Sequence, residues 1–531
     1  MESDLSFGAL QGPSRDSKHP NSAELFPAGL AVPILLGMLL SLGGCATPNT
    51  GNRGFGQSAG ELSLSSFGLI STSPRPETAN TNRQMTISAP SAAGPYTSRT
   101  DFLLILPPIP LPSVGGDTGA GRCITEPGYD NLVCRATDSK TLGSTTDADL
   151  QEFSSCCGGW ADYNAWNTTS TMFFAETNGG SVAVMRFDPT THAIAPLYGE
   201  PVQRGMWSHL DADVAYTFVN SPDPVIGSMT FSSQTVPPRP VAIADLAKVP
   251  DCVPALAGKV DWQELSVSHD EQTFLVGAGT GKQNSAIYAI VYNRTTGCRW
   301  YNTRTGQIGG HYGPVGHATT TDSYTLHSVR ISGDGLTVML GPAHGTKYRH
   351  FWTVDGLYVE AAHDNVNSGH FAIGNAGMIN TAGRTANDAW CNLGMAYRTF
   401  ADMSNPTYII PTLGQCGDTE IEGDDHASWN NDDTSDNQPF FTSTVTIPLG
   451  TLITSAWQNE ILGFSRIDPG TVWRFLSTYN TGTSPFFSCQ NSIGTVSQDG
   501  KWFMFTSDWG NTLGLDSAGN HRCDLFIGQL R

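Results

Sequence analysis

The sequence predicts an all-β protein, a seven-bladed β-propeller with a disordered N-terminal tether. The first indication is a strand, an Asp-Gly turn and a second strand, which occur in this order over residues 324–340 and again over residues 497–507. The second is that related hairpins recur along the C-terminal two-thirds of the chain, as expected when one structural unit is stacked many times. The third is composition, because 58 glycines and only 14% charged residues are typical of a turn-rich extracellular protein.

The first 45 residues have the features of an export signal. Residues 30–42 form an apolar run shorter than the roughly 20 residues that a membrane-spanning helix needs, and the run has the length of a signal-peptide core. The residues at its end, Leu42-Gly43-Gly44-Cys45, resemble the bacterial lipobox, whose cysteine is acylated and becomes the mature N-terminus. This resemblance implies an exported lipoprotein at the outer membrane or cell surface, periplasmic or extracellular. The alternative is a plain secretory signal with Cys45 close to its cleavage site.

Two segments are expected to connect the lipid to the folded domain. Residues 46–100 are rich in Ser, Thr, Gly, Pro, Asn and Ala and cannot bury enough apolar surface to offset ordering entropy, which predicts a disordered tether. Residues 101–158 begin with an apolar stretch broken by prolines and are predicted to be an irregular lead-in held by a disulfide. The propeller is expected over residues 159–531.

The charge of the chain excludes one large class of partner. Asp and Glu number 48 and Lys and Arg 28, which gives a net charge of −20. Binding to a nucleic-acid backbone needs clustered Lys and Arg, so no nucleic-acid partner is expected. We expect contact with a membrane only through the N-terminal lipid, and a monomeric protein.

Ten cysteines remain when Cys45 is set aside, and an even number in an exported chain favours disulfides. No pair shows the repeated two-residue spacing of a zinc site. The predicted pairs are Cys123 with Cys134, Cys252 with Cys298, Cys391 with Cys416, and Cys489 with Cys523. Cys156 and Cys157 are left over, either as a vicinal pair or as a sign that part of this pairing is wrong.

Beyond residue 159 the hairpin signal returns at intervals of about 45 to 65 residues, near the period of four-stranded propeller blades. Seven openings of such units imply seven blades, and they begin at Trp160, Trp207, Leu265, His327, His370, His426 and Asn491. Stacking in a ring suits this composition because each sheet buries its faces against its neighbours. A pair of β-sandwiches is the weaker alternative, since independent sandwiches would not repeat one strand-turn-strand pattern.

Three segments resemble the blade repeat of TolB-type, WD40-like propellers: Ile331-Ser-Gly-Asp-Gly, Val496-Ser-Gln-Asp-Gly-Lys-Trp-Phe, and Val267-Ser-His-Asp-Glu. The order of the motifs around His327, His370 and His426 also resembles a group of exported bacterial propeller lipoproteins. The resemblance implies the fold and leaves the activity open, because one fold serves many functions.

His327, His370 and His426 open three successive units, at the start of what would be the inner strand of each blade. Inner strands line the central channel, so residues far apart in sequence meet at one opening. Three imidazoles are an ordinary way to hold a divalent metal such as Mn, Ca or Zn. Gln415 is the predicted further ligand, and other candidates for the remaining position are Gln490, Asp425 and His317. The alternative is that these histidines fix the packing between blades.

Oligogalacturonate lyases are similar in this respect, because they are propellers that hold a divalent metal with histidines and a glutamine. The resemblance implies a metal-bound uronate carboxylate and a base that abstracts the neighbouring carbon-bound proton. The predicted base and carboxylate clamp lie in one segment and comprise His344, Tyr348, Arg349 and His350. An acidic cluster from Asp418 to Asp436 is a second candidate cation site, for calcium, with a solvated acidic loop as the alternative.

Two functions from different classes follow. In the first, an exported, lipid-anchored propeller binds an extracellular polysaccharide at a histidine-lined channel face, and in the lyase case cleaves it. In the second, the protein is a non-enzymatic, TolB-like scaffold that binds a protein of the cell envelope. The residues alone do not decide between an enzyme and a scaffold.

Overall fold

The computed structural model describes residues 96–531 apart from internal gaps, of which the longest span residues 142–149, 152–164, 253–260, 362–370, 381–394, 411–426 and 484–491. The chain divides into two units, Met1–Phe67 and Gly68–Arg531, and every described residue belongs to the second. The predicted signal peptide with Cys45, and the predicted tether as far as residue 95, lie outside the described residues.

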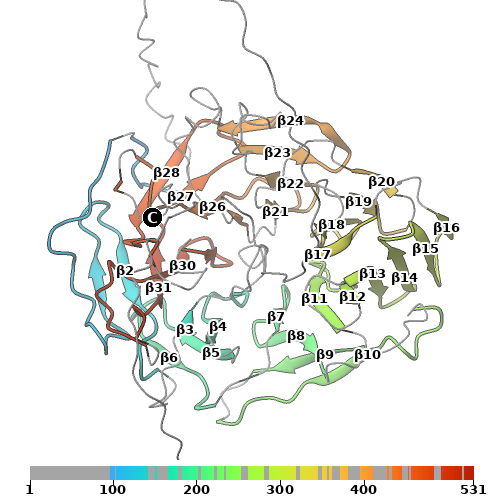
Figure 1. Cartoon of the computed structure of the whole chain (residues 1–531), viewed down its shortest axis with the longest axis horizontal. Coiled ribbons are helices and arrows are strands. Elements are labelled where there is room, and N and C mark those ends of the chain that lie inside the picture. Colours follow the sequence, from blue (N-terminus) through green and yellow to red (C-terminus); the bar gives the residue numbers. More distant parts are fainter. Residues whose placement is uncertain are drawn as a thin grey trace, which may run out of the picture. The chain divides into compact units, whose positions relative to one another are not determined.

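The regular elements in the described residues are all β-strands, as predicted, and they form six antiparallel sheets (Figure 1). Four sheets have four strands each: β3 (Leu150–Gln151), β4 (Met172–Thr177), β5 (Val182–Phe187) and β6 (Ile194–Pro196); β7 (Met206–Trp207), β8 (Val214–Phe218), β9 (Val225–Thr230) and β10 (Val241–Asp245); β21 (Phe371–Ile373), β22 (Gly377–Asn380), β23 (Met395–Thr399) and β24 (Asp402–Ile410); β25 (Ala427–Ser428), β26 (Phe440–Ser443), β27 (Glu460–Phe464) and β28 (Val472–Ser477).

The other two sheets are larger. The fifth combines the two ends of the described chain: β1 (Cys123–Thr125), β2 (Leu132–Arg135), β31 (Asp524–Gln529), β30 (Trp502–Ser507) and β29 (Gly494–Val496). The sixth has ten strands: β11 (Asp261–Val267), β12 (Thr273–Gly279), β13 (Ala286–Asn293), β14 (Gly297–Asn302), β15 (Gln307–Gly310), β16 (Gly316–His317), β17 (Thr325–Ile331), β18 (Thr337–His344), β19 (His350–Thr353) and β20 (Tyr358–Ala361).

These sheets follow one another around a ring as the blades of a propeller do (Figure 1). In the four-stranded sheets the first strand lies toward the centre of the ring and later strands lie outside. The inner strands of the other two sheets are β11 and β17 in the ten-stranded sheet and β29 in the sheet that joins the two ends. In the ten-stranded sheet one residue pair, Ala286 with Leu326, joins β13 to β17. The propeller arrangement is confirmed; of the seven predicted blades, five are present as separate sheets of four or five strands.

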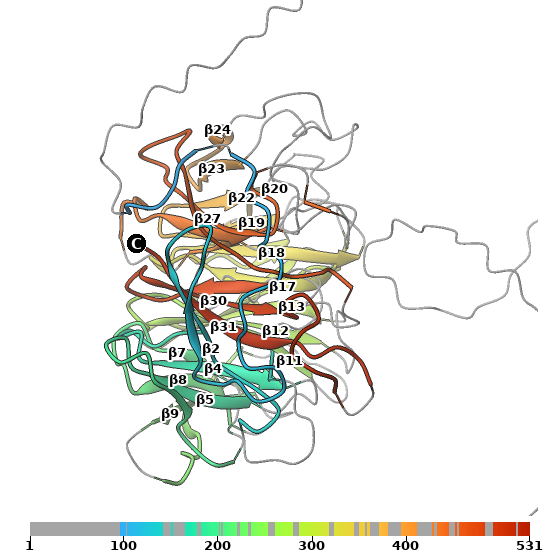
Figure 2. The same cartoon turned by 90° about the vertical axis from the view of Figure 1, so that its left-hand side faces the viewer.

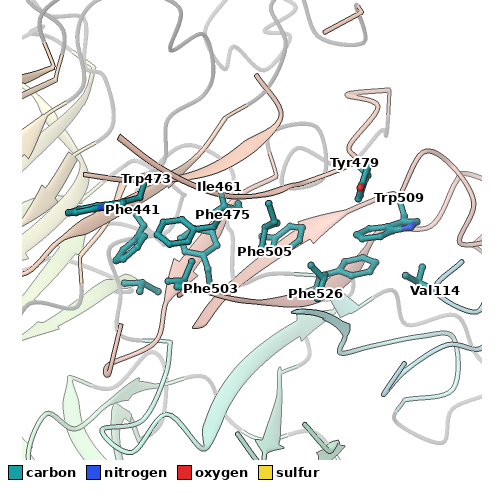
Figure 3. Close-up of a cluster of buried hydrophobic side chains, with 14 of the residues drawn as sticks. Val114, Phe441, Ile461, Trp473, Phe475, Tyr479, Phe503, Phe505, Trp509 and Phe526 are labelled. Carbon is teal, nitrogen blue, oxygen red and sulfur yellow. The ribbon is translucent and has the colours of Figure 1, made fainter. Parts of the chain in front are cut away.

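The strands are apolar on both faces because each sheet packs between two others. Every residue of β12 and of β30 is buried. The largest aromatic cluster lies between the sheet of β25–β28 and that of β29–β31, and it includes Phe441, Phe475, Phe503, Phe505 and Trp509 (Figure 3). Burial on both faces explains why these strands read as nearly continuous apolar runs and not as an alternation of apolar and polar residues.

The turn after an inner strand has one construction in several sheets. Between β17 and β18, the Ser332 hydroxyl donates to Asp334 and accepts a hydrogen bond from the Thr337 N–H at 2.9 Å, and Gly335 has a φ of 73°. Ser497 and Asp499 repeat these contacts at the β29–β30 turn, where Gly500 has a φ of 67°. The predicted Asp-Gly turns are confirmed, with glycine at the left-handed position.

In other sheets the same left-handed position carries a side chain that reaches the neighbouring sheet. Glu271, with a φ of 57°, accepts hydrogen bonds from the His209 N–H at 2.8 Å and from the hydroxyls of Ser208 and Tyr216. Asp436, with a φ of 56°, accepts from the Asn375 N–H at 2.7 Å. The turns of adjoining sheets are thereby bonded together along one face of the ring, which we call the turn face.

The ring closes by pairing of the two ends of the described chain. Strand β2 pairs with β31 through Val133 with Gly528 and Cys134 with Ile527, and the two strands lie side by side in both views (Figures 1 and 2). Beside this pairing, Asp524 accepts hydrogen bonds from the fully buried side chains of Arg135, at 3.1 Å from its Nε, and Arg522, at 2.7 Å from its Nη2. The lead-in is therefore part of the last sheet.

The structure contains two of the predicted disulfides, Cys123–Cys134 between β1 and β2 and Cys252–Cys298. Cys523 is also disulfide-bonded. The remaining cysteines lie outside the described residues, and for them the pairing stays a prediction: Cys156, Cys157, Cys391, Cys416 and Cys489.

Replacement of Arg135 tests the ring closure. Arg135→Met leaves the buried Asp524 without one of its two cations, so we expect the free energy of unfolding in urea to fall by about 3–5 kcal/mol. Arg122→Met is the matched control, because Arg122 directly precedes β1 of the same sheet and is exposed, and it is expected to change stability by less than about 0.5 kcal/mol. Equal stability of the two variants would show that the closure does not depend on this ion pair.

Candidate functional site

The candidate site lies where the inner strands begin. Inner strands end at the turn face, so they start at the opposite face, which we call the start face. Among the inner strands, β11 contacts β17, β21 contacts β25, and β25 contacts β29. Residues at the beginnings of these strands are therefore brought to one end of the ring although they lie far apart in sequence.

The predicted metal ligands are placed as follows. His327 is the third residue of β17, and the residues directly after His370 and His426 begin β21 and β25. His370, His426 and Gln415 themselves lie outside the described residues, as does the side chain of His327. The three strands that these histidines were predicted to open therefore begin at the start face, on successive inner strands. The placing of the histidines at one site stays a prediction.

The predicted base and clamp lie around the β18–β19 connection. His344 ends β18 and His350 begins β19, so this connection also lies at the start face. Tyr348 and Arg349 lie outside the described residues. His350 is fully buried, and its ring stacks on that of Tyr324 with 4.2 Å between centroids and 11° between planes. The ring stack with Tyr324 is a packing contact, and a role for His350 as a base stays a prediction.

A buried ion pair joins two neighbouring inner strands. Glu264 on β11 has a φ of 52° and lies at a break in the register between Gln263 and Leu265. Its Oε2 accepts hydrogen bonds from the Val329 N–H and from Arg330 Nη1, both at 2.7 Å. Ser266 accepts from the Ile331 N–H in the same way, at 3.1 Å. The N–H groups of Val329 and Ile331 point away from β18, the strand paired with β17, and side chains of β11 accept their hydrogen bonds instead.

A group of strained residues near the start face was not predicted from the sequence. Six non-glycine residues there have left-handed φ values between 46° and 72°: Trp457, Asn459, Tyr479, Ser492, Trp509 and Asn511. Each such conformation costs of order 1 kcal/mol, and clusters of them are common at functional sites. These residues lie just before or just after β27, β28, β29 and β30, in connections that also contain buried polar side chains. The sequence Asp-Trp-Gly-Asn at residues 508–511 could have indicated a left-handed backbone here, because glycine and short polar residues such as Asn tolerate this conformation.

Asp508 is the buried acid of this group. It accepts hydrogen bonds from the Thr481 N–H at 3.0 Å, from the Thr481 hydroxyl and from the Gly510 N–H at 3.1 Å. Burial raises the pKa of this carboxyl in spite of these donors. The adjacent Trp509 is fully buried, stacks on Phe526 at 4.6 Å and donates to the Pro112 carbonyl, so it packs in the core and does not present a face to a ligand.

A second buried polar cluster joins the lead-in to the sheet of β25–β28. Glu126 accepts hydrogen bonds from the Tyr479 hydroxyl and from the Gly128 N–H at 2.8 Å. Arg474 donates to both carboxylate oxygens of Glu460, at 2.7 and 2.8 Å. Burial raises the pKa of Glu126 to about 6, the nearby charge of Glu460 adds to this effect, and the hydrogen bonds reduce it.

The other predicted cation site is the acidic cluster, which lies only partly within the described residues. In that part of the chain no group of three or more His, Cys, Asp and Glu side chains is placed to hold a metal. Of the acidic cluster, Asp433 and Asp436 are described, and both bind turn N–H groups. The members from Asp418 to Asp425 lie outside the described residues. The described residues also include no helix long and apolar enough to cross a membrane.

Comparison with known proteins gives similarity in structure only. No family model matches the chain, and no curated protein matches it. Among solved structures, an oligogalacturonate lyase in complex with manganese is similar over 77% of this chain and 96% of its own, with 10% identity and a TM-score of 0.43. TolB from Acinetobacter baumannii is similar over 52% of this chain and 60% of its own, with 14% identity and a TM-score of 0.26. The propeller assignment rests on the sheet order given above.

The raised pKa of Glu126 predicts a dependence of stability on pH. The folded protein binds the Glu126 proton more tightly than the unfolded chain, in which the carboxyl has its ordinary pKa of 4.5. The free energy of unfolding therefore falls as the pH rises from about 4.5 to about 6. The loss amounts to about 2 kcal/mol and persists above that window. Glu126→Gln should remove this part of the pH dependence, measured by urea unfolding between pH 4 and pH 8. Glu200→Gln at an exposed position is the control. An identical pH dependence in both variants would contradict the prediction.

Proposed function

We propose that this protein is an exported, lipid-anchored, seven-bladed propeller that binds an acidic extracellular polysaccharide at its start face. The observation that supports the proposal is that β17, β21 and β25 are successive inner strands. In the sequence, His327 lies within β17, and His370 and His426 directly precede β21 and β25. Cys45 would carry the lipid, and the acylated chain would lie at the outer membrane or cell surface.

The count of seven blades depends on how the ten-stranded sheet is divided. Strands β11–β14 form one antiparallel series with β15 and β16 added at the outside, and β17–β20 form a second. The single pair Ala286 with Leu326 is the link between them. The inner strands β11 and β17 also contact each other as β21 and β25 do. We therefore count this sheet as two blades.

The donor set fits a divalent metal. Neutral imidazoles of His327, His370 and His426 with the amide oxygen of Gln415 form a mixed nitrogen and oxygen set that suits manganese or zinc. A metal bound there would draw electrons from a uronate carboxylate and acidify the neighbouring carbon-bound proton. In the lyase version of the proposal, Arg349 would hold a carboxylate by a bidentate contact, and His344, Tyr348 or His350 would accept the proton.

A second candidate function is a non-enzymatic scaffold that binds an envelope protein. The observation that favours it is the packing of His350 against Tyr324, because a fully buried imidazole in a ring stack is a structural side chain. In this version the three inner-strand histidines would fix blade packing, and binding would use the start face without metal.

Removal of single histidines distinguishes these functions. We expect metal analysis of the purified protein to find a stoichiometric divalent ion, and His370→Ala and His426→Ala to weaken metal affinity at least about tenfold. His521→Ala, at an exposed histidine, is the control and should keep the metal. Polyuronides would be screened in parallel for the absorbance of unsaturated uronate products. Metal-free protein that is unaffected by these substitutions would contradict the first function and favour the scaffold.

A further inference from the structure

The segment that enters the propeller from the N-terminal side exposes a concentration of large apolar side chains. We call residues 103–112 the strap. Four of its residues are strongly exposed: Leu103 at 63%, Leu104 at 45%, Leu106 at 61% and Ile109 at 99%. Single exposed apolar residues are normal on a protein surface. Four within seven consecutive residues form a continuous apolar stretch, and such a patch marks an interaction site.

The strap is fixed to the propeller at both ends, so its exposed residues are not those of a loose terminus. Before it, the ring of Tyr96 packs on Phe441, Trp473 and Phe475. At its first residue, Arg474 Nη1 donates to the Leu103 carbonyl at 2.8 Å, and at its last, Trp509 Nε1 donates to the Pro112 carbonyl at 2.8 Å. Figure 1 shows this blue segment at the outer edge of the ring, on the side of β2 and β28.

Charge and size indicate what the strap contacts. Residues 102–116 contain no ionisable side chain, although the chain as a whole has a net charge of −20. The exposed patch consists of four side chains within seven residues, whereas a stable protein interface takes roughly 20–30 residues on each partner. A short, uncharged, apolar segment of this size suits insertion into the interfacial region of a lipid bilayer, where binding scales with the apolar area inserted.

The strap follows the proposed lipid anchor in the sequence. Cys45 lies about 60 positions before its first residue, directly after the apolar run of residues 30–42, so an acylated Cys45 would tether the strap to a membrane. A tethered lipid would also hold the strap at a high effective concentration near the bilayer.

We infer that the strap is a second, direct membrane contact of this protein, which inserts Leu103, Leu104, Leu106 and Ile109 into the surface of an uncharged bilayer. This inference replaces the expectation from the sequence that the lipid is the only membrane contact. The role of the lipid as the first contact rests on the proposed function; the apolar strap does not. The contact would hold the propeller against the membrane by the edge at β2 and β28, with the ring on its side and both of its faces accessible.

The test is binding of the full chain to vesicles of phosphatidylcholine and phosphatidylethanolamine, at a lipid concentration that binds half of the Cys45→Ala protein. Using Cys45→Ala throughout removes the acyl group, and every variant keeps the same apolar run of residues 30–42. A difference in partition between variants therefore reports on the strap alone, whether or not the lipid prediction holds. We expect the triple variant Leu104→Ser, Leu106→Ser, Ile109→Ser to reduce the partition coefficient roughly tenfold or more. The loss should not depend on salt, because the strap is uncharged.

Leu336→Ser is the matched control, because Leu336 is 63% exposed at the tip of the β17–β18 turn, away from the strap. Ile109→Ser alone is the second variant, since a side chain that is 99% exposed contributes nothing to folding, and it should reduce partition by a smaller factor. Partition of the triple and single variants equal to that of Leu336→Ser would overturn the inference. So would a dimer of the parent protein that the triple variant abolishes, because the strap would then bind a second copy.

Discussion

The structure depends on the pairing of β2 with β31, which joins the two ends of the described chain in one sheet. A ring of sheets is stable only when the first and last units meet, because an open ring would expose an apolar sheet face at each end. The buried group of Arg135, Arg522 and Asp524 lies beside this pairing. Buried ion pairs contribute little to net stability, but a pairing of β2 with β31 that left one of these charges unpaired would be strongly unfavourable. This group therefore favours the observed alignment of the two ends.

The two faces of the ring have different tasks. On the turn face, Glu271 and Asp436 bind the turns of neighbouring sheets, which fixes the sheets relative to one another. On the start face, inner strands begin after connections of varied length, and the strained residues and buried Asp508 lie there. A rigid face of bonded turns thus supports an opposite face whose connections are free to carry a site.

Sequence reasoning could find features that depend on neighbouring residues. The Asp-Gly turns at Gly335 and Gly500 follow from local chemistry, and the Cys123–Cys134 pair from close spacing across a hairpin. The interactions of Glu271 could not be found in this way, because its acceptor role requires a turn more than 60 residues away. The raised pKa of Glu126 likewise depends on burial created by ring closure, which outweighs the opposing hydrogen bond from Tyr479. For the histidine site, the sequence correctly predicted that strands begin close to His327, His370 and His426. The meeting of the three side chains concerns atoms outside the described part of the chain and stays a prediction.

The most direct test of ring closure is hydrogen exchange of the native protein, followed at the amides of residues 132–136 and 524–529. If β2 is an integral strand of the last sheet, both groups of amides should exchange only through global unfolding, with equal free energies of opening that denaturant lowers equally. Exchange of the β2 amides orders of magnitude faster than that of the β31 amides would contradict the account, because it would show that the ring stays folded while its closing strand is detached.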